Sequence, residues 1–249
     1  MSDYKIEHGV TFINEEGAEK HTFTDFGIYP QTKGMPFPPE VQVEFIDVPG
    51  MDGRLDATQA LDGIVHYMDR NYEQSFLIVD PEADWHSIYS NVLNFLHGRK
   101  MRAVFDDDPL WYYEGRIEVG EPEPNEVGYI TIPIRGTLKP YKYSVIDSTD
   151  EDWLWDPFDF ETGVIRVYKD MPVDGATTIT VIGSQMPVVP IITVHSENGN
   201  GMRVTFAGVT YNLVDGANRI PAMTIQSGEY GLIFDGFGFV SIYYREGSL

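Results

Sequence analysis

Apolar and polar residues alternate with two different periods along the chain, and one segment has the period of a helix. Between Asp84 and Gly98, six apolar side chains recur at intervals that place them on one face of an α-helix. They are Trp85, Ile88, Tyr89, Val92, Phe95 and Leu96. Asp84 can cap the first turn, and Gly98 can adopt the left-handed conformation that ends a helix. A helix flanked by strands covers one face of a sheet, so this stripe predicts the centre of a core.

Elsewhere in the first 143 residues the pattern predicts strands and turns. The strands are expected over residues 10–13, 21–28, 41–46, 64–69, 72–79, 102–105, 110–117 and 129–138. Val41, Val43 and Phe45 alternate with polar residues, which indicates a half-buried strand. Pro133 interrupts the last strand and favours an edge position for it, because proline cannot donate to a ladder. Proline-rich stretches predict loops at residues 30–39 and 121–126.

The composition changes after residue 143. Residues 147–161 combine seven carboxylates with two tryptophans and two phenylalanines, and we interpret residues 144–162 as an acidic, aromatic linker. Beyond it, strands are expected over residues 164–168, 177–182, 191–195, 202–206, 209–213, 223–226, 230–234 and 239–245. Short strands at this spacing are typical of a β-sandwich or jelly roll, here residues 163–249. The segment Gly236-Phe237-Gly238 is interpreted as a hairpin turn.

Composition narrows the function classes. Seventeen Lys and Arg against 39 Asp and Glu give a formal net charge of −22, and this field repels phosphate backbones and anionic membranes. We therefore expect no specific nucleic-acid binding and no membrane association. Cysteine is absent, which excludes disulfides and thiolate chemistry. The first ten residues lack the apolar run of a signal peptide, so we expect synthesis in the cytoplasm.

Candidate chemistry is sparse. The sequence lacks a nucleophile elbow, a P-loop and a dinucleotide fingerprint, so we predict no enzyme and no catalytic, cofactor-binding or metal-binding residue. Three groups could bind a metal ion: His86 with His97, the run Asp106-Asp107-Asp108, and residues 147–161. Each group can instead have a purely structural role. Exposed aromatic residues of the second domain could instead stack on sugars. The candidates are Trp153, Trp155, Tyr211 and Tyr244.

Three blocks of sequence resemble a known family. Val48-Pro49-Gly50-Met51-Asp52-Gly53-Arg54-Leu55-Asp56 looks like the VPG-x-DG-x-LD turn of siphophage distal tail proteins, the Dit-like hubs of the tail tip or baseplate. A second block runs from Leu96-His97-Gly98 through Asp107-Asp108-Pro109 to Glu114-Gly115-Arg116. Leu138-Lys139-Pro140-Tyr141 matches the exit from the family's N-terminal domain. The resemblance covers roughly residues 20–143.

The resemblance implies a mainly β protein with an architectural role. Its fold would be an N-terminal ring-forming β-sandwich with one α-helix and long hairpins, residues 1–143, followed by a galectin-like or carbohydrate-module-like β-sandwich. Six copies would form a ring at the tail tip of a virion. The implied partners are the tail tube and tape-measure end, a tail-associated lysin or fibre, and a receptor-binding protein. The alternative is a carbohydrate-binding tail or baseplate module that contacts host cell-wall sugars.

Overall fold

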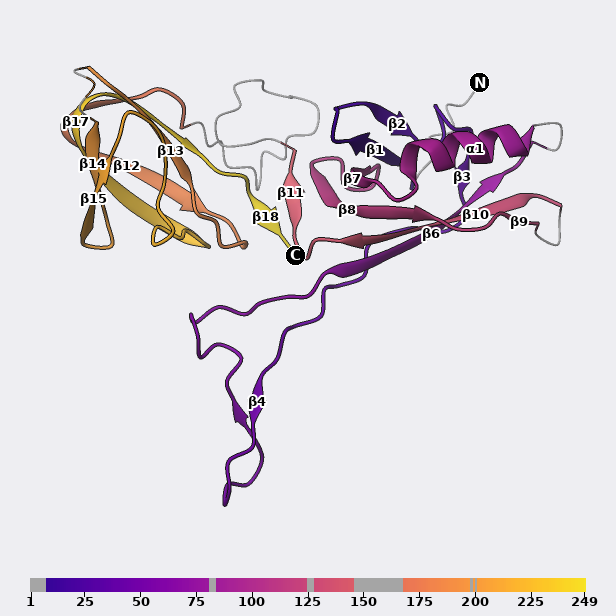
Figure 1. Cartoon of the computed structure of the whole chain (residues 1–249), viewed down its shortest axis with the longest axis horizontal. Helices are drawn as coiled ribbons and strands as arrows, with labels where there is room; N and C mark the ends of the chain where they lie inside the picture. The colour runs from indigo at the N-terminus through magenta and orange to yellow at the C-terminus, as the bar shows by residue number, and fades with distance from the viewer. Residues whose placement is uncertain (1–7, 81–83, 125–127, 146–167, 198, 200) are drawn as a thin grey trace. The chain divides into compact units, whose positions relative to one another are not determined.

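The computed structural model describes residues 8–80, 84–124, 128–145, 168–197, 199 and 201–249. It is mainly β with one α-helix, as the sequence predicts. The chain divides into two units, Met1–Lys142 and Tyr143–Leu249, and each has its own hydrophobic core. Figure 1 shows the elements of both units.

The first unit is built on one antiparallel sheet. Along the sheet the strands follow the order β2 (Glu19–His21), β1 (Val10–Asn14), β7 (Lys100–Phe105), β8 (Trp111–Val119), β10 (Ile130–Leu138), β6 (Arg70–Ile78) and β3 (Tyr29–Pro30). The short strand β9 (Glu123–Pro124) also pairs with β10. Alternate residues of each long strand face the core, so that Phe12, Ala103, Ile117, Ile134 and Phe76 are fully buried.

Helix α1 (Trp85–Leu96) covers the buried face of this sheet. Its predicted stripe is confirmed: Val92 and Leu96 are fully buried, and the other four stripe residues pack against the core. Asp84 caps the helix by accepting a hydrogen bond from the backbone nitrogen of Ser87, at 3.3 Å. Gly98 follows with φ of 72°, and its amide donates to the carbonyl of Ile117. Both predicted signals of the helix ends are therefore correct.

Two predictions for the sheet of this unit are wrong. Residues after His21 do not continue as a strand but turn back, because the Asp25 side chain accepts from the His21 amide and Gly27 takes a positive φ. Strand β10 is central, not an edge, despite Pro133. It pairs with β8 only from Ile134 onward and with β9 only at residues 130–131. Pro133 lies at the break between these partners, so its missing N–H costs no ladder bond there.

The second unit contains a six-stranded antiparallel sheet. The strands are β12 (Met171–Gly183), β13 (Ile191–Ser196), β14 (Met202–Phe206), β15 (Val209–Leu213), β16 (Gly216–Arg219) and β17 (Gly228–Tyr243). They follow the order β15-β14-β17-β13-β16, with β12 also on β17. The short strands β11 (Lys142–Ser144) and β18 (Gly247–Ser248) pair with each other. Val181, Val194, Val204, Phe234 and Ile242 are among the fully buried core residues.

Strand β17 overturns the predicted turn at residues 236–238. It runs unbroken through Gly236 and Gly238, which take φ angles of 156° and 137°. A Cβ on Gly238 would lie 2.1 Å from the carbonyl oxygen of His195 and 3.0 Å from Met202. These glycines therefore serve close strand approach where β17 changes partner from β14 to β13, not chain reversal. Residues 223–226 form only an isolated bridge, between Ile225 and Val188.

Candidate interaction surface

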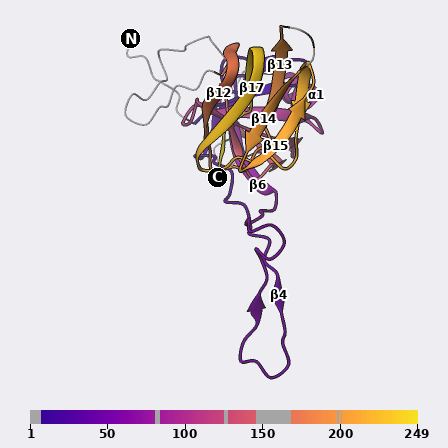
Figure 2. The same cartoon turned by 90° about the vertical axis from the view of Figure 1, so that its left-hand side faces the viewer.

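A long hairpin projects from the edge of the first sheet, between β3 and β6. We call residues 37–69 the arm; Figure 2 shows it extending away from the sheet. Its two antiparallel legs are joined by β4 (Phe45–Ile46) and β5 (Leu55–Asp56). Nearer the sheet, the Gln42 amide donates to the carbonyl of His66, and the Met68 amide to that of Glu40. The strands predicted over residues 41–46 and 64–69 are thus mostly legs of this hairpin.

The arm has no core of its own. Every residue from 37 to 69 is exposed or half-buried, so the prediction of a half-buried strand at Val41–Ile46 is wrong in its environment. Large apolar side chains are exposed along both legs: Phe37, Val41, Val43, Phe45, Ile46, Val48, Met51, Leu55, Leu61 and Met68. A two-stranded hairpin is marginally stable alone in water, and an apolar surface of this extent marks a protein contact.

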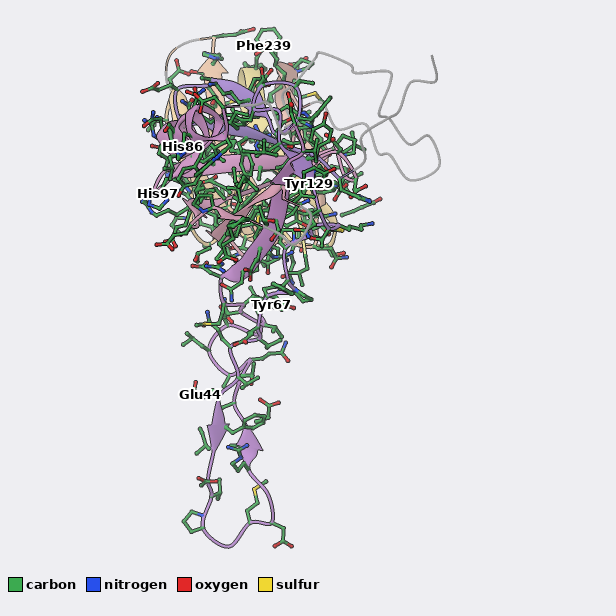
Figure 3. The ribbon with its side chains drawn as sticks, turned by 90° about the vertical axis from the view of Figure 1, so that its right-hand side faces the viewer. Glu44, Tyr67, His86, His97, Tyr129 and Phe239 are labelled. Atoms are coloured by element: carbon green, nitrogen blue, oxygen red, sulfur yellow. The ribbon has the colours of Figure 1, made fainter. Side chains whose placement is uncertain are left out.

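The arm is also strongly acidic. It contains one basic residue, Arg54, and seven carboxylates, which are Glu40, Glu44, Asp47, Asp52, Asp56, Asp62 and Asp69. Figure 3 shows Glu44 directed outward from one leg. Hydrogen bonds from the Thr58 side chain and amide hold the pKa of Asp56 below its ordinary value. The Ile64 amide and His66 do the same for Asp62. Asp56 and Asp62 are therefore ionised at neutral pH.

Buried polar groups fix the base of the arm. Gln74, on β6, donates to the carbonyls of Thr32 at 2.9 Å and His8 at 3.0 Å, and accepts from the Tyr72 hydroxyl at 2.8 Å. Gln74 is 1% exposed, so these bonds form away from water and are costly to break. Farther out, Tyr67 packs edge-on against Tyr141, with ring centroids 5.9 Å apart. These contacts fix the position of the backbone where the arm begins and ends.

The tip of the arm is a tight turn made by the VPG-x-DG block. Gly50 and Gly53 have φ angles of 82° and 80°, a region that disfavours other residues, and the Met51 amide donates to the carbonyl of Val48. The Arg54 guanidinium lies over the Phe45 ring, 4.6 Å from its centroid. The first block of the family resemblance therefore forms the tip of the arm, the part of the arm farthest from the first sheet (Figure 1).

The outward face of the first sheet has a basic cluster. Lys100, Arg102, Arg116 and Lys139 surround Glu114 on β7, β8 and the end of β10; we call this cluster the basic face. Lys100 and Lys139 both form ion pairs with Glu114. Partial burial acts to raise the pKa of Glu114, but hydrogen bonds from the two lysines outweigh it and lower that pKa. Sequence reasoning missed this face, although Arg102 begins a predicted strand and Lys100 stands two residues before it.

The metal candidates are engaged in other contacts. Asp106 and Asp107 pair with His21 and His8, at 3.2 and 2.6 Å, and Asp108 pairs with Lys142 at 2.7 Å. His86 stacks on Trp85, while Nδ1 of His97 accepts from the Val119 amide. Among the residues that the structure describes, no group of three or more His, Cys, Asp and Glu could hold a metal ion. Residues 147–161 lie outside those described.

The predicted sugar-stacking residues have different fates. Tyr244 is 2% exposed and donates to the Ile182 carbonyl at 2.6 Å, so it cannot stack on a sugar. Tyr211 is half-buried against the core, and Trp153 and Trp155 lie outside the described residues. The exposed aromatic rings of β17 are instead Phe237 and Phe239, which are 55% and 50% exposed; Figure 3 marks Phe239.

No protein-family model and no curated protein matches the sequence. Among solved structures, the chain is similar to the Dit protein (gp 19.1) of SPP1, described as a paradigm of the hub adsorption apparatus of phages that infect Gram-positive bacteria. The match covers 96% of this chain and 99% of that one, with a TM-score of 0.57 and 12% sequence identity. The chain has the fold of a phage tail hub protein.

The structural match covers 96% of the chain and therefore includes residues of both units. The second block of family resemblance extends from the end of α1 into β8 and includes Glu114 and Arg116 of the basic face. In the part of the chain that the structure describes, no helix has the length and apolar character to cross a membrane.

Proposed function

We propose that the chain is a structural distal tail protein of a phage or prophage. Six copies form a ring at the tail tip of the virion, through the unit of residues 1–143. The ring joins the tail tube and tape-measure end to a tail-associated lysin or fibre and to a receptor-binding protein. The proposal assigns the chain no catalytic role. It draws on the hub fold, and the galectin-like character of residues 163–249 is part of it.

The arm is the observation that carries self-assembly. Ten large apolar side chains are exposed on a hairpin without a buried residue, and their removal from water requires another protein surface. An arm that leaves one edge of its own sheet makes a head-to-tail contact with a neighbour. Contacts of that kind close into rings when the rotation between subunits is a fraction of a full turn.

Native mass spectrometry of the full chain tests the proposal. Six copies of the 28.2 kDa chain give a ring of about 169 kDa, the product 6 × 28.2. The matched variant replaces residues 38–68 with a short Gly-Ser linker. We expect it to keep the far-ultraviolet circular dichroism of the sheet and to run as a monomer. A wild-type chain that stays monomeric at all concentrations would contradict the ring.

Sugar binding by the second unit is a second candidate function. Phe237 and Phe239 project from the same face of β17, where Pro172 and His195 stand opposite Phe239 on the two neighbouring strands. Two exposed rings on a sheet face form a flat apolar surface of the kind that stacks on a sugar ring. A glycan array with the wild-type chain and the variant Phe239→Ala tests this. Equal signals from both chains would exclude this face as the sugar site.

A further inference from the structure

The structure contains two surfaces of opposite charge within the same unit. The arm has one basic and seven acidic residues, a net charge of 1 − 7 = −6. The basic face has four cations around Glu114, and Glu15 stands beside Lys100, so the local net charge is +2, the difference 4 − 2. In a chain of net charge −22, this concentration of positive charge on one sheet face is unusual.

We propose that the arm of one copy binds the basic face of a second copy. The proposal rests on the proposed self-assembly and names the surface that receives the arm. The contacting part of the arm is the side that presents Glu44, Ile46 and Leu55. Ile46 and Leu55 stand directly opposite each other across the hairpin and are 46% and 48% exposed. Glu44 lies on the same side as Ile46, because side chains alternate along a strand.

The basic face has a depression that suits this arrangement. It measures about 240 Å³, and the residues that line it are Ile13, Asn14, Glu15, Lys100, Met101, Arg102 and Glu114. Ile13 offers an apolar contact to Ile46 or Leu55, and the cations beside it offer partners to Glu44. Glu44 then meets a cation at the rim while Ile46 and Leu55 leave water, the usual arrangement of a protein interface.

The basic face places two like charges opposite each other. Lys100 and Arg116 are direct cross-strand partners in the β7–β8 ladder, an arrangement that destabilises a sheet, and Glu114 offsets only part of their charge by pairing with Lys100. Arg102 stacks over Tyr112, at 5.3 Å from the ring centroid, which holds its guanidinium at the outward surface. A carboxylate from a docked arm would neutralise part of this repulsion.

The geometry excludes the arm's own sheet as the receiving surface. The arm starts at β6, which is three strand spacings from β7, about 14 Å across the sheet. Figures 1 and 2 show it extending away from that sheet, and its leg of 14 residues from Phe37 to Gly50 spans at most about 45 Å. The opposite charges act at contact distance, inside the Debye length of about 8 Å, whereas salt screens the longer-range repulsion between two acidic subunits.

A charge-reversal cycle tests the contact by sedimentation velocity and native mass spectrometry of the full chain. Arg102→Glu and Glu44→Arg, each alone, are expected to weaken assembly about tenfold or more, because each places like charges together. The double variant restores the opposite-charge pair and should recover most of the lost affinity. Arg219→Glu, an exposed reversal on β16 of the second unit, is the matched control and should leave assembly unchanged. Thermal melting of each variant verifies folding.

The outcomes separate the two proposals. A wild-type chain that stays monomeric overturns the ring and this contact together. A wild-type ring that both single reversals leave intact overturns the contact alone. Loss of assembly in both singles without recovery in the double variant also overturns the pairing of Glu44 with Arg102. Recovery in the double variant supports it, since a merely destabilised fold would not be rescued by a second reversal on another surface.

Discussion

Replacing Leu96 with alanine tests whether α1 holds the first unit together. Leu96 is fully buried in the last turn of the helix and packs into the core between helix and sheet. Removing its branched end leaves a cavity that the surrounding strands fill only in part. Substitutions of this kind at fully buried leucines cost about 3 kcal/mol, within a range of 2–5.

The size of the unit converts this cost into a melting temperature. Unfolding entropy is about 2.1 cal/mol/K per residue, so the unit Met1–Lys142 has about 0.3 kcal/mol/K. A loss of about 3 kcal/mol then lowers its melting temperature by about 10 °C. The second unit has a separate core, so its transition should not move.

Differential scanning calorimetry of the full chain measures both transitions in one scan. Asn94→Ala is the matched control, because Asn94 is exposed on the same helix and alanine favours helix formation. We expect the control to melt at or slightly above the wild-type temperature. If Leu96→Ala lowers the melting temperature of the first unit by less than about 3 °C, the apolar stripe of α1 contributes little to the stability of that core, and the packing argument is refuted.

Two further predictions concern charge and backbone. The pKa of Glu114 is lower in the folded chain than its ordinary value of 4.5. Ionised Glu114 therefore stabilises the fold above the unfolded-state pKa, and this stabilisation is lost as the pH falls through the folded-state pKa. A plot of melting temperature against pH should accordingly fall less steeply below pH 4.5 for Glu114→Gln than for the wild type, and parallel curves would contradict this. Gly238→Ala should destabilise the second unit by about 2–4 kcal/mol, because its Cβ meets the His195 carbonyl oxygen in a strained backbone region. Urea unfolding measures this loss, and Gly231→Ala, whose Cβ would have only an ordinary contact with Thr178, should cost far less.

Local signals in the sequence predicted local structure well. Helix α1 was predictable because its cap, its apolar period and its terminal glycine all lie within fifteen residues and act on one another directly. Strands β14 and β15 were predicted residue for residue, since a two-residue turn separates two alternating segments. In both cases the residues that determine the structure lie next to one another in the sequence.

Features that depend on distant partners were not predictable. The alternation at Val41–Ile46 is that of a half-buried strand, but burial requires a second layer, and the sequence does not show that this layer is missing. Pro133 favoured an edge position, but its strand is central because β8 and β9 leave a break opposite Pro133. That break depends on two other segments and cannot be seen in the sequence around Pro133. The basic face was not predictable because its cations come from β7, β8 and the residue after β10, and these segments become neighbours only in the sheet.

The acidity of the arm has a consequence for the chain before it meets any partner. Two free copies could in principle pair through their apolar hairpins, arm against arm, and such off-pathway dimers would withdraw subunits from assembly. Glu40, Glu44 and Asp47 stand among the exposed apolar residues, so two arms side by side would bring like charges together. The same carboxylates therefore oppose the association of one arm with the arm of a second copy.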